Sequence, residues 1–189
     1  MRNLVWSKFA NNGQTCIAPD HVYVHASVRA EFLDKLKARI RRVYGADAAA
    51  QRSSPDYCRI VNARHFERLR GLLEDALQRG ARLVTGGELV AEECFIAPTV
   101  LVDVNGRPKP LALYVYAEDR AVAEQVLGNT SAGGSCVNHS LVHFLHGNLP
   151  FGGVNHSGLG NAHGVFGFRA FSHERAVLVD RYSSTHLLF

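Results

Sequence analysis

Residues 8 to 25, KFANNGQTCIAPDHVYVH, carry the clearest information about how this chain folds. The first half is a polar turn containing glycine that leads to Cys16, and the second half alternates polar and apolar residues from His21 to His25. Alternation with a period of two is typical of a β-strand. The stretch therefore predicts a turn that bears a cysteine, followed directly by a strand at 21–25.

Helical and extended segments alternate along the rest of the chain. Apolar residues at helical spacing predict amphipathic helices, and short β-branched runs predict strands. Gly80 is placed as a stop signal for the second helix. The expected helices are 28–43, 62–78 and 118–127, the expected strands are 82–85, 99–104 and 111–117, and 45–55 is expected to be a loop. Strands joined by helices favour an α/β sheet over a helical bundle or a β-sandwich.

The composition of the 189 residues is that of a globular chain of about one domain. It is 47% hydrophobic and 20% charged, which excludes a disordered chain. We expect no membrane span and no signal peptide, and hence a cytoplasmic protein, because no long apolar run is present. The net charge of +4 is spread along the chain, and the basic residues at 35–42 fit the polar face of a helix, so no nucleic-acid partner is predicted.

The four cysteines stand far apart and form no C-x-x-C pair, which argues against a disulfide framework: Cys16, Cys58, Cys94 and Cys136. Cys16 is singled out because a glycine-containing turn can expose the sulfur and aim backbone N–H groups at it. Both effects favour the thiolate, which is the form that attacks a carbonyl carbon. The alternative is a small buried residue, the common role of an isolated cysteine.

Two further patterns receive structural interpretations. Cys136 and the histidines His139, His143 and His146 have spacings that could place several ligands on one helical face. The stretch shows no helical periodicity and soon reaches Pro150, so no metal site is predicted. The glycines of 152–164 lack the spacing of a dinucleotide fingerprint and predict a tightly turning structural loop.

Several blocks together resemble the NAD(P)-dependent aldehyde dehydrogenases. Residues 9–16, FANNGQTC, closely resemble the motif around the active-site cysteine of that family, and residues 17–24 continue the match. Residues 96–101, 109–116 and 149–154 resemble later blocks in the family's order, and 164–173, GVFGFRAFSH, resemble the class 3 branch of fatty, aromatic and coniferyl-type enzymes. The resemblance covers nearly the whole chain. It implies an α/β fold like the three-layer catalytic domain of the family, in truncated form.

The resemblance also implies a mechanism. Cys16 matches the catalytic nucleophile, whose thiolate adds to the aldehyde carbon to form a thiohemiacetal. Hydride then passes to NAD or NADP, and water hydrolyses the thioester to the carboxylic acid. The backbone N–H of Cys16 would supply half of the oxyanion hole. Phe151 matches a cofactor-binding aromatic near the nicotinamide, and Asn12 and Gln14 match residues that shape the cysteine turn.

The chain departs from the family's pattern in two places. Only fifteen residues precede Cys16, where the family has its cofactor domain, its general-base glutamate and the asparagine of the oxyanion hole. The Glu-Glu-Ile-Phe-Gly-Pro block is also absent, and Asn105 and Gly106 are expected to form a tight turn across the gap. A missing general base costs about 10²–10⁴-fold in rate. These losses argue against NAD(P) binding and activity by this chain alone.

The expected organisation is a truncated catalytic domain at 1–153 and a C-terminal segment at 154–189 that resembles the family's oligomerisation region. Apolar residues of that segment would seek a partner: Phe166, Phe168, Phe171 and the end at 187–189. The expected partners are a small aldehyde and a second copy or a related chain. Three functions stay open: a dehydrogenase completed by another chain, a weak cysteine esterase, and a non-catalytic fragment that associates with full-length relatives.

Overall fold

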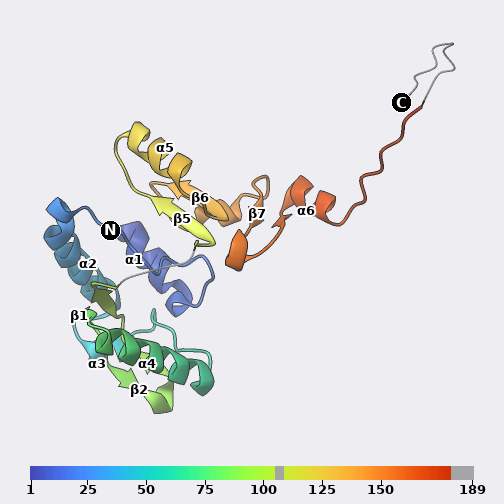
Figure 1. Cartoon of the computed structure of the whole chain (residues 1–189). Helices are drawn as coiled ribbons and strands as arrows, with labels where there is room; N and C mark the ends of the chain where they lie inside the picture. The colour runs from blue at the N-terminus through green and yellow to red at the C-terminus, as the bar shows by residue number, and fades with distance from the viewer. Residues whose placement is uncertain (105–108, 180–189) are drawn as a thin grey trace, which may run out of the picture.

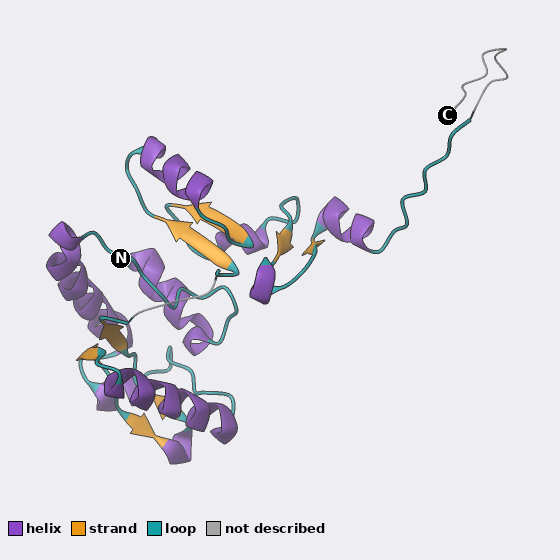
Figure 2. Ribbon diagram, viewed as in Figure 1, coloured by secondary structure: helices purple, strands orange, loops and turns teal. Residues whose placement is uncertain are grey.

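The structure is a computed structural model that describes residues 1–104 and 109–179, and it mixes helices with short strands (Figures 1 and 2). The α-helices are α1 (Arg2–Phe9), α2 (Arg29–Tyr44), α3 (Ala48–Ser53), α4 (Ala63–Gln78), α5 (Arg120–Asn129) and α6 (Gly164–Ala170). The strands are β1 (Arg82–Thr85), β2 (Leu89–Val90), β3 (Phe95–Ile96), β4 (Val100–Val102), β5 (Ala112–Val115), β6 (Gly134–Val137), β7 (Phe151–Gly152) and β8 (Asn161–Ala162). The 3₁₀ turns include η4 (Val142–Leu145), whereas η1 (Ala10–Gly13) has left-handed angles at Asn11 and Asn12.

The predicted α/β class is confirmed, and its clearest unit is β5–α5–β6. The two strands of this unit are parallel, from Ala112 opposite Gly134 to Val115 opposite Val137, and α5 is the crossover between them. The remaining pairs, β1–β4, β2–β3 and β7–β8, are antiparallel. Within the described ranges, the strands thus form four separate two-stranded sheets.

Local sequence signals account for the elements that were predicted correctly. Helix α4 begins where the side chain of Asn62 accepts a hydrogen bond from the backbone N–H of His65, 3.0 Å away. It ends as predicted before Gly80, whose φ of +94° suits glycine and whose N–H donates to the carbonyl of Leu77. The helices α2 and α5 and the strands β1, β4 and β5 also lie where they were expected.

Two predictions were wrong. Residues 21–25 form no strand and pair with no strand in the described chain, and Tyr23 is 87% exposed. Alternation favours a strand but does not supply a neighbouring one to pair with. The expected loop at 45–55 contains α3, which begins where the carboxylate of Asp47 accepts a hydrogen bond from the N–H of Ala50. Helix α6 lies in a segment for which no helix or strand was predicted, because its sequence shows little helical periodicity. The turn expected at Asn105 and Gly106 lies outside the described residues.

The core lies where α1, α2 and β3 meet. Its buried members are Val5, Phe9, Ile40, Tyr44, Tyr57, Phe95 and Ala97. The aromatic rings touch edge to face, with centroids 5.6 Å apart for Phe9 and Tyr44, 5.2 Å for Tyr44 and Tyr57, and 6.0 Å for Tyr57 and Phe95. Because Phe9 is the last residue of α1, the turn that leads to Cys16 starts from this rigid core.

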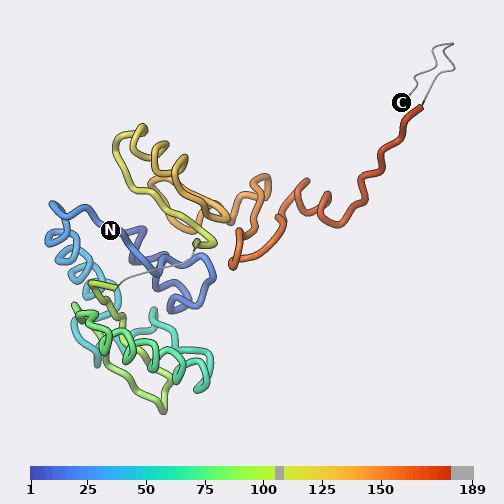
Figure 3. Tube along the Cα trace, viewed as in Figure 1, coloured from blue at the N-terminus to red at the C-terminus, as the bar shows by residue number. Residues whose placement is uncertain are grey.

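The chain exposes an unusually large surface. Its accessible area is 13,685 Å², whereas a compact monomer of this mass exposes about 9,000 Å². Part of the excess lies at the C-terminal end, where α6 and the extended residues 172–179 project from the body (Figure 3). Phe168, Phe171 and Leu178 there are 74%, 96% and 94% exposed. In the described ranges, no helix is long and apolar enough to cross a membrane.

Candidate active site

Cys16 occupies the corner of a β-turn on the surface. The N–H of Ala18 donates a 2.9 Å hydrogen bond to the carbonyl of Thr15, which places Cys16 at the second position of the turn. Cys16 is exposed, while its neighbour Ile17 is only 5% exposed. The cysteine is therefore accessible to a small molecule, and the residue after it anchors the turn in the interior.

Three consecutive left-handed residues bring the chain from α1 to this turn. The φ angles are 52° at Asn11, 54° at Asn12 and 74° at Gly13. Asparagine and glycine are the residues that adopt this conformation at the lowest cost. At Gly13 the conformation also allows close approach, since a Cβ there would lie 3.2 Å from the carbonyl oxygen of Lys8. The polar NNG sequence thus folds into a sharp reversal rather than into a continuation of α1.

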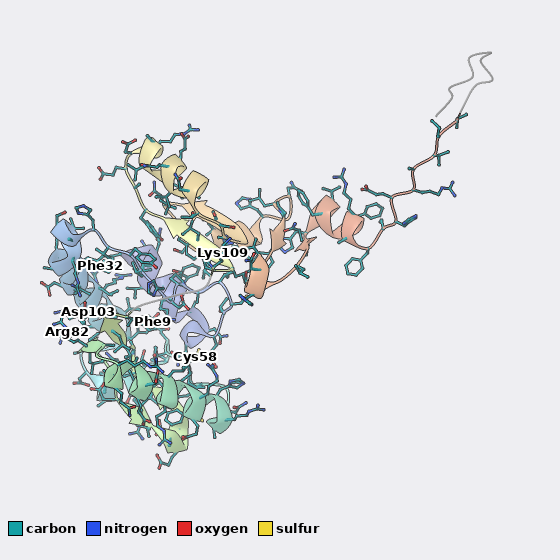
Figure 4. The ribbon with its side chains drawn as sticks, viewed as in Figure 1. Phe9, Phe32, Cys58, Arg82, Asp103 and Lys109 are labelled. Atoms are coloured by element: carbon teal, nitrogen blue, oxygen red, sulfur yellow. The ribbon has the colours of Figure 1, made fainter. Side chains whose placement is uncertain are left out.

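The loop from Cys58 to Val61 holds this reversal from one side. The Asn12 side chain donates to the carbonyl of Cys58 over 3.1 Å. The Gln14 side chain donates to the carbonyl of Arg59 over 3.0 Å and accepts from the N–H of Val61 over 2.9 Å. Figure 4 labels Cys58 below Phe9, which starts the reversal. The hydrogen bonds support the expectation that Asn12 and Gln14 shape the cysteine turn.

Tyr114 of β5 holds the turn from the other side. Its hydroxyl donates to the carbonyl of Ile17 over 2.7 Å, next to Cys16. Burial raises the pKa of Tyr114 to about 12, so the phenol is protonated and remains a donor at neutral pH. The sequence predicted a strand here but gave Tyr114 no role.

Phe151 lies in a cluster of aromatic rings on β7. Its ring stacks on His163 with centroids 5.6 Å apart and meets Phe144 edge to face at 5.1 Å. His143 lies 6.3 Å from Phe151 and 5.8 Å from the ring of Tyr114. The two residues that the sequence placed in the active site, Cys16 and Phe151, are thus connected through Tyr114 and His143.

His143 is the most deeply buried histidine of this cluster, with 8% of its surface exposed. Both ring nitrogens are buried and without a hydrogen-bond partner in the described chain. Burial lowers the pKa of His143, which favours the neutral imidazole. The ring packs against β6 so closely that a Cβ on Gly134 would lie 3.1 Å from it.

The histidines considered as metal ligands do not gather into a site. His139 uses Nδ1 to accept a hydrogen bond from the N–H of Ser140 over 2.9 Å, while His143 faces the aromatic cluster. Cys136 lies on β6, where burial raises the pKa of its thiol. Over residues 1–104 and 109–179, no group of three or more Asp, Glu, His or Cys residues could hold a metal ion.

The glycine-rich loop is filled by its own backbone. A Cβ on Gly152 would lie 2.0 Å from the carbonyl oxygen of Gly160, and one on Gly153 would lie 2.1 Å from that of Ser157. These approaches support the prediction of a tightly turning structural loop. The stacking of His163 also covers one face of Phe151.

Comparison with known proteins gives the context of this site. The family model described as "Aldehyde dehydrogenase family" matches residues 1–109 and 104–177. The chain is 41% identical over 90% of its length to bovine aldehyde dehydrogenase family 3 member B1, and 37% identical over 94% of its length to the bovine dimeric NADP-preferring aldehyde dehydrogenase. It covers 42% of the first of these relatives and 84% of the second.

A solved structure of an aldehyde dehydrogenase has a similar fold. The substrate-bound Staphylococcus aureus AldH is 33% identical, with a TM-score of 0.83 over 97% of this chain and 46% of its own. The chain also covers 42% of the mouse family 3 member A2, which is 37% identical to it, so it spans less than half of either protein. Its motifs, its fold and the matched family model agree, and the chain belongs to the aldehyde dehydrogenase family.

Proposed function

We propose that this chain supplies the nucleophilic cysteine for oxidation of an aldehyde to a carboxylic acid, with NAD or NADP as the hydride acceptor. The observation that carries the proposal is the exposed position of Cys16 on a turn that is held from both sides. A nucleophile acts fastest when its position is determined before the substrate arrives. The family membership gives the aldehyde as the substrate class.

The step assigned to this chain is addition to the carbonyl. The thiolate of Cys16 forms a bond to the carbonyl carbon, the π electrons move to oxygen, and that oxygen takes a proton from water. The backbone N–H of Cys16 is proposed as one donor to the developing oxyanion, a contact worth about 3 kcal/mol in other enzymes. Tyr114 keeps this backbone in place through Ile17. Phe151 is proposed to face the nicotinamide.

The large exposed surface of the chain favours a second function, which is association with another chain of the family. The area exceeds that of a compact monomer by roughly half and includes the apolar side chains of Phe168, Phe171 and Leu178. We propose that residues 154–189 form the segment that meets a second copy or a related chain, and that 1–153 form the catalytic part. Apolar side chains in such numbers are typical of surfaces that become buried on association. The cytoplasmic location stays a prediction.

The experiment compares the wild-type chain with Cys16→Ser. Incubation with p-nitrophenyl acetate is expected to place one acetyl group on Cys16, located by peptide mass spectrometry, and Cys58 serves as an internal example of another exposed thiol. Acetylation of Cys16 and Cys58 at the same rate would refute a specialised nucleophile. NADH formation from an aromatic or a long-chain aldehyde should need a further chain. NADH formed by the chain alone would contradict the account of the cofactor.

A further inference from the structure

The cysteine turn and the Cys58–Val61 loop are joined by a group of hydrogen bonds that bridge 45 to 47 residues of sequence. On the turn side the donors and acceptors are side-chain atoms of Asn12 and Gln14. On the loop side they are backbone atoms of Cys58, Arg59 and Val61. Figure 4 labels Cys58 near the place where these two segments meet.

Gln14 uses its whole carboxamide group in this arrangement. Its Nε2 donates to the carbonyl of Arg59 over 3.0 Å and to that of Asn11 over 3.1 Å. Its Oε1 accepts from the N–H of Val61 over 2.9 Å. A glutamine side chain has two N–H donors and one carbonyl oxygen, so both donors and the oxygen are engaged. The side chain therefore has one favoured position, and so does the backbone that carries it, two residues before Cys16.

The backbone beside Gln14 needs such support. Asn11 and Asn12 both adopt left-handed φ angles, which asparagine tolerates better than most residues but at a higher cost than glycine. Conformations of this kind persist where surrounding contacts determine them. Without the bonds to the loop, the segment between Phe9 and Cys16 would have lower-energy conformations to adopt.

The loop is itself firmly attached to the core, so it can act as a support. Ile60 is 5% exposed, and its N–H donates to the carbonyl of Cys94 over 3.0 Å. The guanidinium of Arg59 lies 5.0 Å from the centre of the Phe95 ring and pairs with the carboxylate of Glu93 at 3.2 Å. The buried Tyr57, just before the loop, donates its hydroxyl to the carbonyl of Ile96 over 2.8 Å.

We propose that the Cys58–Val61 loop is a positioning element of the Cys16 site and that Gln14 is the residue through which it acts. The inference rests on the proposed role of Cys16 as the nucleophile and extends it to a segment distant in sequence. Gln14 does not touch the substrate. It determines where the thiolate and the backbone N–H of Cys16 stand when an acyl group or aldehyde arrives.

The main variant is Gln14→Met, which keeps the length of the side chain and removes its three hydrogen bonds. A second variant, Asn12→Gly, removes the bond to Cys58 and keeps a residue that accepts a left-handed φ. The matched control is Asp119→Ala, which deletes one N-cap bond of α5, from the N–H of Ala121, and lowers stability elsewhere. If Asp119→Ala lowers the free energy of unfolding less than Gln14→Met does, the control also carries Asp47→Ala, which deletes the N-cap bond of α3. The double variant then matches the stability loss of Gln14→Met.

The first measurement is hydrogen–deuterium exchange by mass spectrometry on peptides that contain residues 15–18. We expect exchange there to accelerate in Gln14→Met and, to a smaller extent, in Asn12→Gly, while the stability-matched control resembles wild type. The reason is that the N–H of Ala18 is protected by its bond to Thr15, which the loop keeps in place. Unchanged exchange at 15–18, or equal acceleration in the control, would overturn the proposal.

The second measurement compares two reactions of Cys16. Acylation by p-nitrophenyl acetate needs the thiolate and the backbone N–H in a defined geometry, and we expect Gln14→Met to slow it by on the order of a hundredfold. Alkylation by iodoacetamide needs only an accessible thiolate and should change far less. Equal slowing of both reactions would contradict positioning. If wild-type Cys16 is not acylated at all, the proposed function fails, whereas the exchange result still decides whether Gln14 holds the turn.

Discussion

Replacement of Phe95 by alanine should show how much the packed core contributes to the stability of the chain. Phe95 is 1% exposed, its ring meets Tyr57 at 6.0 Å, and the guanidinium of Arg59 lies over it at 5.0 Å. Truncation of a buried phenylalanine costs about 3–5 kcal/mol, because transfer energy is lost and a cavity remains. In a chain of this length each 1 kcal/mol lowers Tm by about 2–4 °C. We therefore expect Tm to fall by about 6–20 °C.

Urea unfolding followed by circular dichroism measures the loss in free energy of unfolding, and a thermal scan measures the fall in Tm, with Phe168→Ala as the control. Phe168 lies on α6 and is 74% exposed, so its truncation should change the free energy of unfolding by no more than about 0.5 kcal/mol. Phe95→Leu should fall between the two, since it keeps part of the ring's volume. A loss for Phe95→Ala as small as that for Phe168→Ala would refute the assignment of Phe95 to a packed core.

Two further predictions concern the aromatic cluster and the glycine loop. Because burial lowers the pKa of His143 below its ordinary 6.5, the unfolded chain takes up a proton before the folded chain does, and stability should fall as the pH drops below about 6.5. Urea midpoints at pH 7.5 and 5.5 should therefore differ more in wild type than in His143→Leu. An equal difference in the two proteins would contradict the burial argument. Gly153→Ala should lower the free energy of unfolding by about 1–3 kcal/mol, since its Cβ would lie 2.1 Å from the Ser157 carbonyl oxygen. Gly71→Ala, in α4 with nothing within 4 Å of the added Cβ, should stabilise the chain in the same urea assay. A stabilising effect of Gly153→Ala would refute the packed loop.

Elements with a signal at each end were predictable from the sequence. Asn62 and Gly80 bracket α4 because each supplies a hydrogen bond or a backbone conformation that the end of a helix requires. Asp47 supplies the same kind of signal for α3, but the helix that follows has only six residues, which are too few to show a helical period. The prediction of α3 as a loop therefore failed because the pattern was too short.

The segment at 21–25 shows a different limit. Its alternation predicted a strand, and no strand forms there in the described chain. A strand also needs backbone partners on an adjacent segment, and pairing is a property of two segments rather than of one. The pattern of Val22, Tyr23 and Val24 cannot indicate whether a partner exists. The exposed side chains of Val22 and Tyr23 are the structural consequence.

Some residues of the candidate site were predictable from the sequence and others were not. Cys16 could be found because its turn is encoded by neighbouring residues whose types matter, in particular two asparagines and a glycine at left-handed positions. Tyr114 and His143 could not, since a tyrosine in a strand and a histidine before a glycine-rich loop have many ordinary roles. Their importance depends on contacts across 97 residues to Ile17 and on burial among rings.

The Cys58–Val61 loop is harder still to recognise, for a physical reason. It supports the cysteine turn with backbone carbonyl and N–H groups, which every residue except proline provides in the same form. The contacts with Asn12 and Gln14 therefore place little demand on the side chains of Cys58 and Val61. The identity of Ile60 matters instead, because its burial sets the position of those backbone groups. A segment of this kind can determine the geometry of a nucleophile and still show no motif, so its role becomes visible only in the folded chain.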